Sequence, residues 1–314
     1  MPKEANASRA SAAGSDPVAA YPVIRLRHPG QWLSAAIIVL AAVLGARLLA
    51  TNKNIDWPVV GDTLFSRPIL YGVLETLELT FLSMAIAIVL GVLLAVMRLS
   101  HNPVLSWVSW LFLWVFRSVP ALVQLIFWYN LGLFVPTIAL VIPFGPTLAS
   151  ISTNVLISGF TAAILGLSLH FGAYMAEVVR AGLTSVDTGQ HEAAQALGMP
   201  STLTLRRIVL PQAMRLIIPP TGNQFLSLLK TTSLVSVIGG GDLLTRVQEI
   251  YSHTFKVVEL LIVASLWYLL LTSIATVGQY YVERHFSKGK TSESPRRRKR
   301  HLRYIRHSSA IEEG

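Results

Sequence analysis

The chain has no cysteine and few charged residues. Among its 314 residues, charged side chains make up 13% and hydrophobic side chains 53%, whereas a soluble domain usually carries about 25% charged residues. The absence of cysteine excludes a disulfide framework, cysteine-ligated zinc or iron–sulfur centres and a thiol nucleophile. With a mean hydropathy of +0.55, the composition indicates a membrane protein.

Motifs for catalysis and for metal binding are also missing. No G-x-x-x-x-G-K-[ST] loop occurs, because the residues before Lys230-Thr231 are LSLL and contain no glycine to cradle phosphate. The histidines between residues 100 and 260 fall in different segments without metal-ligand spacing. Neither a G-x-S-x-G elbow nor an acid pair suited to hydrolysis is found. We expect no enzyme activity, no metal and no cofactor in this chain.

Positive charge is concentrated at the C-terminal end. Ten Lys or Arg and one acid, Glu293, lie between Arg284 and Arg306, while the rest of the chain is close to neutral. A basic run can bind nucleic acid, but no folded basic domain accompanies this one. A basic segment directly after a last apolar span also orients a membrane protein and can contact anionic lipid. We therefore expect membrane lipid, not nucleic acid, as its partner.

The hydrophobic runs predict an all-α, polytopic membrane helix bundle with about six transmembrane helices and a polar helix on the cytoplasmic side. Residues 1–30 are predicted to be a disordered cytoplasmic tail, and residues 31–70 an extra first transmembrane helix with a periplasmic loop. Residues 71–286 form the predicted core with five transmembrane helices, and residues 287–314 a basic cytoplasmic tail.

Six apolar segments are long enough to be read as spans: Trp32–Ala50, Tyr71–Met97, Pro120–Phe134, Leu156–Leu183, Ile208–Ile238 and Val257–Tyr281. The fifth is expected to be a broken helix, because it contains Pro211, Pro219, Pro220 and Gly222. Six crossings place both termini on one side, with the arginines near the span ends and the basic tail all inside. This topology predicts an inner-membrane protein with cytoplasmic N- and C-termini.

Three segments connect the predicted spans. Residues 102–116 carry Trp107, Trp110 and Trp114 at helical spacing, which fits a helix lying in the membrane interface. For Trp114, a position inside a span is an equally good interpretation. Residues 136–152 contain three prolines and are predicted to be an outer loop, and residues 242–256 an amphipathic segment outside.

A stretch too polar for lipid, QHEAAQALGM, occupies residues 190–199 between the fourth and fifth spans. Asp187 or Thr188 can cap the start of a helix here, and Gln190 stands in the position of a capping-box partner for Asp187. Gly198 is placed to adopt the left-handed conformation after the helix, and Pro200 prevents continuation. We predict a short, exposed helix on the cytoplasmic side that docks a soluble partner.

Several ordered blocks of sequence resemble one family. They are TLELTFLSMAIAIVLGVLLAVMRLS (76–100), FRSVPALVQL (116–125), GAYMAEVVRAG (172–182), GQHEAAQALGM (189–199), IVLPQAMRLIIPPTGNQFLSLLKTTSLVSVIG (208–239) and VQEIYSHTF (247–255). Together they cover roughly residues 71–286 and are similar to the permease subunits of bacterial ABC importers for polar amino acids. The resemblance implies transport of a polar or charged amino acid, or of a related compound such as an opine.

The resemblance also implies partners and a coupling site. In that family the Glu-Ala-Ala…Gly segment is the coupling helix, which sits in a groove of the ATPase subunit. The matching positions are Gln190, Glu192, Ala193, Ala194, Gly198, Leu210 and Pro211. A dimer of ATP-binding subunits, a periplasmic substrate-binding protein and a second permease subunit, identical or homologous, are the implied partners. A stand-alone secondary transporter or channel is the alternative, but it gives no reason for the polar helix.

Polar residues inside the spans are candidates for the substrate path, since ionisable groups at membrane depth usually face a cavity or a partner. The candidates are Glu177, Arg180, Asn223, Gln224, Lys230, Thr232 and Ser233. Glu177 and Arg180 can equally form a structural pair, three residues apart on one helix. Asn223 and Gln224 can equally pack between the two permease subunits. Lys230, which follows the prolines, could attract a carboxylate.

The chain departs from the family pattern at three places. It has Arg-Ser-Val-Pro at residues 117–120 in place of Arg-Gly-Thr-Pro, and Thr231 in place of an aspartate after Lys230. It also has Asp242 in place of a glutamate before Leu243. The missing acid at Thr231 leaves Lys230 without its usual neighbour, so the local charge and the substrate preference are open.

Overall fold

The computed structural model describes residues 29–141 and 147–286. The chain forms two compact units, Met1–Ile55 and Asp56–Gly314. The described part of the first unit contains α1 (Pro29–Ala50), whose apolar stretch runs from Trp32 to Leu48. The predicted first span is therefore a helix. It begins two residues inside the predicted N-terminal tail, whose remainder lies, like the basic tail, outside the described residues.

The second unit contains the remaining elements. Its helices are α2 (Trp57–Leu64), α3 (Arg67–Arg98), α4 (Pro103–Ser118), α5 (Ala121–Tyr129), α6 (Thr153–Leu156), α7 (Gly159–Thr184), α8 (Thr188–Ala196), α9 (Ser201–Thr204), α10 (Leu210–Thr231), α11 (Leu243–Thr254) and α12 (Val257–Phe286). Short 3-10 helices η2 (Leu131–Leu133) and η4 (Thr232–Ile238), a π-helical turn η3 (Leu205–Val209), and strands β1 (Thr137–Val141) and β2 (Thr147–Ser152) connect them.

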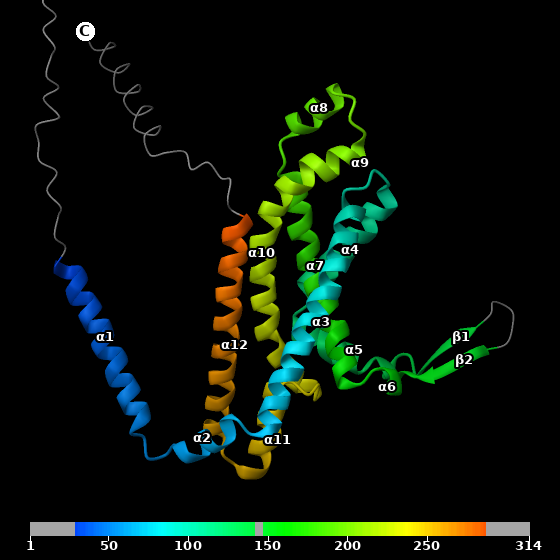
Figure 1. The fold of residues 1–314 in the computed structure, drawn as a ribbon. Coiled ribbons are helices and arrows are strands. Elements are labelled where there is room, and N and C mark those ends of the chain that lie inside the picture. The colour runs from blue at the N-terminus through cyan, green and yellow to red at the C-terminus, as the bar shows by residue number, and fades with distance from the viewer. Residues whose placement is uncertain (1–28, 142–146, 287–314) are drawn as a thin grey trace, which may run out of the picture. The chain divides into compact units, whose positions relative to one another are not determined.

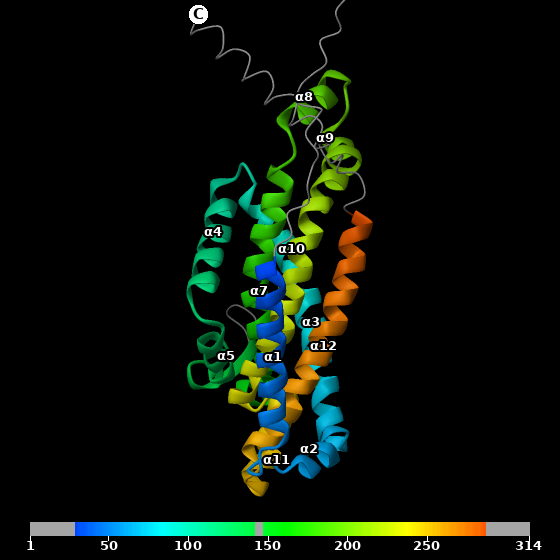
Figure 2. The same ribbon diagram turned by 90° about the vertical axis from the view of Figure 1, so that its left-hand side faces the viewer.

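The long helices of this unit run side by side, with α8 and α9 at one end and α2 and α11 at the other (Figures 1 and 2). Within residues 29–141 and 147–286, α3, α7 and α12 are each long and apolar enough to cross a membrane. The bent pair α4 and α5 makes a fourth span if it is counted as one. Composition alone does not mark α10 as a span, because it carries polar residues such as Arg215, Asn223 and Lys230. The fold is thus the expected helical membrane bundle, with three or four spans identified by length and hydrophobicity.

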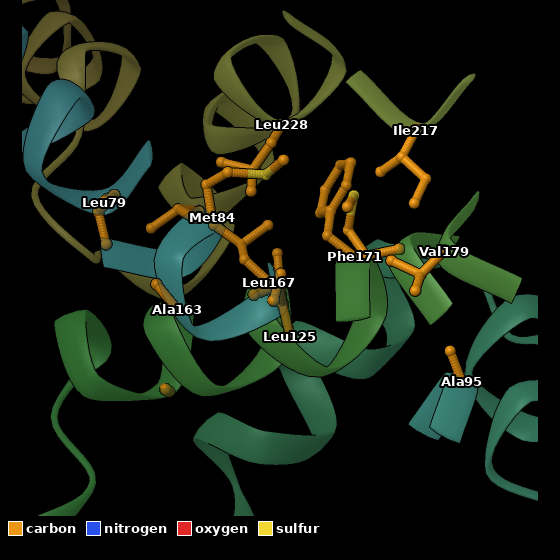
Figure 3. Packing of buried hydrophobic residues seen from close by; sticks show 14 of the residues in the cluster. Leu79, Met84, Ala95, Leu125, Ala163, Leu167, Phe171, Val179, Ile217 and Leu228 are labelled. Atoms are coloured by element: carbon orange, nitrogen blue, oxygen red, sulfur yellow. The ribbon is translucent and has the colours of Figure 1, made fainter. Parts of the chain in front are cut away.

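The core of the bundle lies around α7, which packs against α3 and α10. Leu79 and Met84 of α3, Leu167 and Phe171 of α7, and Leu228 of α10 belong to one buried cluster (Figure 3). Small residues allow the helices to approach closely, as is common between membrane helices. A Cβ atom built on Gly91 of α3 would lie 2.5 Å from Cβ of Met175.

The predicted third span is a shorter helix than expected, and it is preceded by a separate helix over the segment predicted to lie in the interface. Helix α5 has only 9 residues, about 13 Å at 1.5 Å per residue, which is too short to cross a bilayer alone. Helix α4 runs alongside α3 and α7, and it is bent by 103° relative to α5 (Figure 2). The break occurs before Pro120, which lacks an amide hydrogen. The Gln124 side-chain amide donates hydrogen bonds to the carbonyls of Phe116 (2.9 Å) and Val119 (2.8 Å).

The predicted break of the fifth span at its prolines is wrong. Helix α10 continues through Pro219 and Pro220, because each proline removes only its own hydrogen bond and the bonds on either side remain. The α-helix ends later, at η4, where hydroxyl groups bond to nearby carbonyls. Thr232 donates to Leu229 (2.7 Å) and Ser236 to Ser233 (2.8 Å). Such bonds compete with the regular helix pattern, and Gly239 with φ +63° ends the segment.

The predicted outer loop, residues 136–152, contains the one departure from an all-α fold in the described residues. Strands β1 and β2 pair antiparallel, with Ile138 opposite Ile151 and Thr137 opposite Ser152. Three of these residues, Thr137, Ile138 and Ile151, are β-branched and favour an extended backbone. The hairpin extends away from the helices at the same end of the bundle as α11 (Figure 1).

Candidate functional site: the polar helix and an arginine-lined cleft

Helix α8 begins and ends as its sequence predicts. Asp187 accepts a hydrogen bond from the backbone N–H of Gly189 at 2.6 Å, which caps the first turn. At the other end Gly198 has φ +71°, and the N–H groups of Gly198 and Met199 donate to the carbonyls of Gln195 (2.9 Å) and Ala194 (3.0 Å). This pair of bonds is the Schellman ending that a left-handed glycine allows. The helix is therefore held at both ends by local contacts.

The predicted capping box does not form. The Oε1 atom of Gln190 accepts a hydrogen bond from Nε2 of Gln212 on α10, at 3.5 Å. In a capping box the Gln190 side chain would instead accept from the backbone N–H of Asp187. The contact with Gln212 connects the start of α8 to the first turn of α10.

The predicted coupling residues divide into two groups. Gln190, Glu192, Ala193, Gly198, Leu210 and Pro211 are exposed. Ala194 is only 1% exposed and faces inward, so it supports α8 instead of contributing to its outer surface. Sequence reasoning missed Leu197, which is 80% exposed on an otherwise polar segment. A single large apolar residue just before a helix-ending glycine was the available signal.

A polar cleft of about 670 Å³ opens between the last turn of α3, α4 and the second half of α7. Three arginines line it, namely Arg98 of α3, Arg117 of α4 and Arg180 of α7. Glu177 is the one acid among its lining residues. The charged side chains of the cleft thus carry two more positive charges than negative ones.

Each charged group of the cleft has a different environment. Arg180 binds Glu177 through two hydrogen bonds, Nη2 to Oε1 at 2.5 Å and Nε to Oε2 at 3.1 Å. Arg98 donates from Nη1 to the hydroxyl of Ser106 at 2.8 Å. The guanidinium of Arg117 lies over the ring of Tyr174, with Cζ 5.5 Å from the ring centroid. This geometry is a cation–π contact.

Aromatic side chains form part of the wall. Trp110 and Trp114 stack on each other, with ring centroids 6.2 Å apart and an interplanar angle of 11°, and both line the cleft with Tyr174. Sequence reasoning considered Arg117 only as part of the Arg-Ser-Val-Pro segment and did not connect it, or Arg98, with Glu177. The signal for Arg117 was its charge inside an otherwise apolar stretch.

The remaining path candidates lie elsewhere. Asn223 Oδ1 accepts a hydrogen bond from Gln279 of α12 at 3.0 Å, so Asn223 makes a helix–helix contact within this subunit. Thr232 and Ser233 donate to carbonyls of their own turns. Gln224 is half-buried and Lys230 is exposed, and neither side chain has a hydrogen bond or an ion pair with another residue that the structure describes.

Lys230 and Glu177 are not brought together. Gly182 of α7 lies against Ile217 of α10, which places these two residues at the same level. Glu177 is five residues from Gly182, and Lys230 is thirteen residues from Ile217 in the same direction. At 1.5 Å per residue the two levels differ by about 12 Å, so the seven candidates do not form one site.

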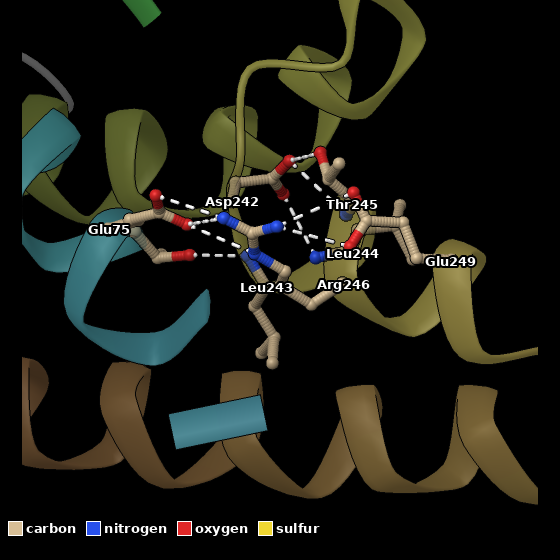
Figure 4. A network of polar contacts seen from close by, with 8 residues as sticks. Glu75, Asp242, Leu243, Leu244, Thr245, Arg246 and Glu249 are labelled. Carbon is tan, nitrogen blue, oxygen red and sulfur yellow. Dashed lines mark hydrogen bonds and ion pairs between the residues drawn. The ribbon is translucent and has the colours of Figure 1, made fainter. Parts of the chain in front are cut away.

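At the opposite end of the bundle, polar contacts hold α11 against α3 (Figure 4). Arg246 forms ion pairs with Glu75 (3.0 Å) and Glu249 (3.1 Å). Asp242 caps α11 by accepting from the N–H groups of Leu244 (3.0 Å) and Thr245 (3.3 Å). Burial raises the pKa of the Asp242 carboxyl, although the hydrogen bonds from Thr245 and Leu244 act in the opposite direction. Among the described residues, no group of His, Asp or Glu is arranged to hold a metal ion.

These features define a polytopic membrane protein with a capped polar helix between two of its long helices. Residues 87–288 match the family described as binding-protein-dependent transport system inner membrane component. The chain belongs to this family. It is a permease of the ATP-binding cassette (ABC) importer class, a membrane-spanning transport subunit and not an enzyme, and it works with an ATPase and further subunits.

Two curated relatives are described as arginine permeases. The arginine transport system permease protein ArgU of Corynebacterium glutamicum is 47% identical over 284 residues, which cover 90% of this chain and 87% of that protein. The arginine transport system permease protein ArtQ of Bacillus subtilis is 35% identical over 216 residues, covering 69% of this chain and 91% of that protein.

Solved structures of ABC transporters are similar as well. The crystal structure of an amino acid ABC transporter with histidines aligns with a TM-score of 0.60 and 33% identity, covering 69% of this chain and 94% of that chain. The MetNI methionine ABC transporter in an inward-facing conformation aligns with a TM-score of 0.54 and 22% identity, covering 71% of this chain and all of that chain. At that identity the second likeness supports the fold alone.

Proposed function

We propose that this chain carries polar or charged amino acids, or related compounds such as opines, across the inner membrane, driven by a separate ATPase that docks on α8. The observation that carries the proposal is α8 itself. It is a polar helix with a defined start and end, located between α7 and the segment leading to α10. A polar surface of this kind is unfavourable in lipid, but it can bind a soluble partner protein.

The substrate class is supported by the relatives. ArgU and ArtQ are described as parts of arginine transport systems, and the likeness to the former covers most of this chain. The cleft between α3, α4 and α7 contains charges of both signs, as a path for zwitterions requires.

The assembly follows from the coupling surface. Two permease subunits, identical or homologous, enclose the path, and a dimer of ATP-binding subunits binds at the two copies of α8. The ATP-binding subunits hold the ATP, a periplasmic binding protein delivers the substrate, and the N- and C-termini of the permease are cytoplasmic. Residues 71–286 are the transporting core, preceded by the extra helix α1.

Helix α8 transmits motion because its neighbours are closely packed. It continues from α7 and is joined to α10 through α9 and η3. Gly182 of α7 is so close to Ile217 of α10 that a Cβ atom at residue 182 would lie 2.3 Å from Cγ1. Nucleotide-driven closure of the ATPase then displaces α8, and α7 and α10 move with it as one body.

A stand-alone secondary transporter or channel is the competing function. Family membership favours the ATP-driven importer, and reconstitution separates the two. The permease with its ATPase partner, in proteoliposomes supplied with binding protein and L-arginine or L-glutamine, is expected to accumulate substrate only when ATP is present. Uptake driven by an ion gradient without the ATPase would support the competing function.

The docking assignment has its own test. Gly198→Asp introduces a side chain and a charge where φ is +71°, so we expect uptake to fall at least tenfold with loss of the link between ATP hydrolysis and transport. Gly61→Asp in α2 is the matched control, since no atom lies within 4 Å of a Cβ built there. Normal ATPase binding and normal uptake in the Gly198→Asp protein would refute docking at α8.

A further inference from the structure

Arg117 differs from the other two arginines of the cleft in having no polar partner. Arg180 is bound to Glu177 and Arg98 to Ser106. Within residues 29–141 and 147–286, the Arg117 side chain has no ion pair and no hydrogen bond. Its guanidinium lies over the face of the Tyr174 ring, and its charge also acts at longer range on Glu177. The ring contact orients the guanidinium and leaves its N–H donors free.

The position of Arg117 in the helix bundle makes a free charge costly. Tyr174 lies ten residues before the end of α7, about 15 Å from that end, and a bilayer core is about 30 Å thick. Arg117 therefore lies near mid-membrane depth. Unpaired charges at such depth usually face a water-filled path or bind a ligand.

The other groups of the cleft determine the charge of that ligand. Glu177 is already neutralised by Arg180, so Arg117 and Arg98 remain as excess positive charge. A volume of about 670 Å³ lies within the range of small-molecule sites, roughly 300–1,000 Å³. The aromatic walls formed by Trp110 and Trp114 suit an organic ligand with an apolar part.

We propose that Arg117 binds the α-carboxylate of the transported amino acid, and that the Glu177–Arg180 pair faces its α-amino group. This rests on the proposed function and adds a recognition site within the membrane. A guanidinium matches a carboxylate with two parallel hydrogen bonds, which a lysine cannot reproduce. Tyr174 is a positioning residue that holds the guanidinium plane through the ring contact.

A phospholipid headgroup is the competing anion, and its location argues against it. Lipid phosphates lie at the membrane surface, level with the ends of the long helices. Arg117 lies about 15 Å deeper, at the level of Tyr174. A transported solute reaches that depth, whereas a lipid phosphate reaches it only if the headgroup is drawn into the core.

The test uses the permease assembled with its ATPase in nanodiscs, without binding protein, so that only the membrane site is measured. Each amino acid is compared with the same molecule lacking its carboxylate, L-arginine with agmatine and L-glutamine with 4-aminobutanamide. The choice between the two pairs is made with the proteoliposome uptake assay: the amino acid used is the one that the wild-type transporter accumulates when ATP is present. If the wild type accumulates neither amino acid, the proposed function fails for these substrates, and the inference fails with it.

Arg117→Gln is expected to weaken binding of the amino acid by about 10- to 100-fold, the effect of one charged hydrogen-bonded contact, and to leave binding of the amine unchanged. The affinity of Arg117→Lys for the amino acid should lie between those of wild type and Arg117→Gln. This variant keeps the test valid if Arg117→Gln does not assemble. Arg67→Gln is the matched control, because Arg67 is exposed at the opposite end of α3.

Two results would overturn the proposal: assembled Arg117→Gln binds the amino acid with unchanged affinity, or it loses equal affinity for the amino acid and for the amine. In either case, ATP-dependent uptake by the wild type would still support the proposed function. Native mass spectrometry tests whether the cleft binds a lipid instead. A bound anionic phospholipid that Arg117→Gln releases, with amino-acid affinity unchanged, would assign the cleft to lipid instead.

Discussion

Arg246 of α11 binds Glu75 of α3 across 171 residues of sequence, with Nη2 3.2 Å from Oε1 and 3.0 Å from Oε2 (Figure 4). The two side chains are 31% and 30% exposed, so water and salt weaken their attraction. We expect a coupling energy of about 0.5–1 kcal/mol from a double-mutant cycle of Glu75→Gln and Arg246→Gln, measured by thermal unfolding in detergent. The coupling should shrink in 0.5 M salt. A coupling near zero at low salt would show that the ion pair does not hold α11 on α3.

Gly91 allows α3 and α7 to approach closely. A Cβ atom there would lie 2.5 Å from Cβ of Met175 and 2.9 Å from the backbone nitrogen of Ala176, so the helices must separate to accept it. Overpacking of this kind typically costs about 1–3 kcal/mol, and we expect Gly91→Ala to lower the thermal unfolding temperature clearly. Gly278→Ala on α12 is the control, because no atom lies within 4 Å of its added Cβ. Equal behaviour of the two variants would refute the close contact between α3 and α7.

The carboxyl of Asp242 should make stability depend on pH. Burial raises its pKa in the folded protein, whereas in the unfolded chain the proton is released near pH 3.9, roughly the ordinary aspartate value. The folded state then binds more protons than the unfolded state just above that pH. The contribution of Asp242 to the free energy of unfolding therefore falls as pH rises.

Asp242→Asn isolates this effect. The variant should be less stable than wild type. The N–H groups of Leu244 and Thr245 donate to different oxygens of Asp242, whereas the asparagine amide keeps one acceptor oxygen and places an NH2 donor at the other position. Thermal unfolding of both proteins from pH 4 to pH 7 should give a difference that narrows as pH rises. A difference that widens over that range would mean that the folded state favours the charged carboxylate.

The basic tail is expected to be dispensable for transport. Residues 295–314 lie after α12 and outside the matched family region, which ends at residue 288. Deletion of these residues should leave ATP-dependent uptake within about twofold of wild type, because the positive charges nearer to α12 still orient the protein. Complete loss of uptake in correctly inserted protein would assign the tail an essential role.

Helix α8 shows what can be predicted from sequence. Its cap at Asp187 and its left-handed end at Gly198 depend on residues within one turn of each other, so the pattern was sufficient. The capping box was wrong because Gln190 had a second possible partner, Gln212, which is 22 residues away. Nothing in the local sequence distinguishes the two contacts.

The bend between α4 and α5 illustrates the opposite case. Pro120 indicated an interruption, but the extent of the third span depended on where the freed carbonyls found donors. Gln124 supplies them for Phe116 and Val119, and it lies 3.1 Å from Nδ1 of His170 on α7. A contact with a helix 46 residues away cannot be read from hydropathy.

Hydrophobic length, composition and helix-end signals are properties of neighbouring residues, so they identified a membrane bundle with a polar helix before any helix was placed. The grouping of Arg98, Arg117 and Glu177 around one cleft, and the separation of Lys230 from it, are different. They depend on the level at which each helix packs against the next. Close contacts, such as Gly91 with Met175 and Gly182 with Ile217, determine that level. Those contacts join residues far apart in the chain, and only the packed structure decides them.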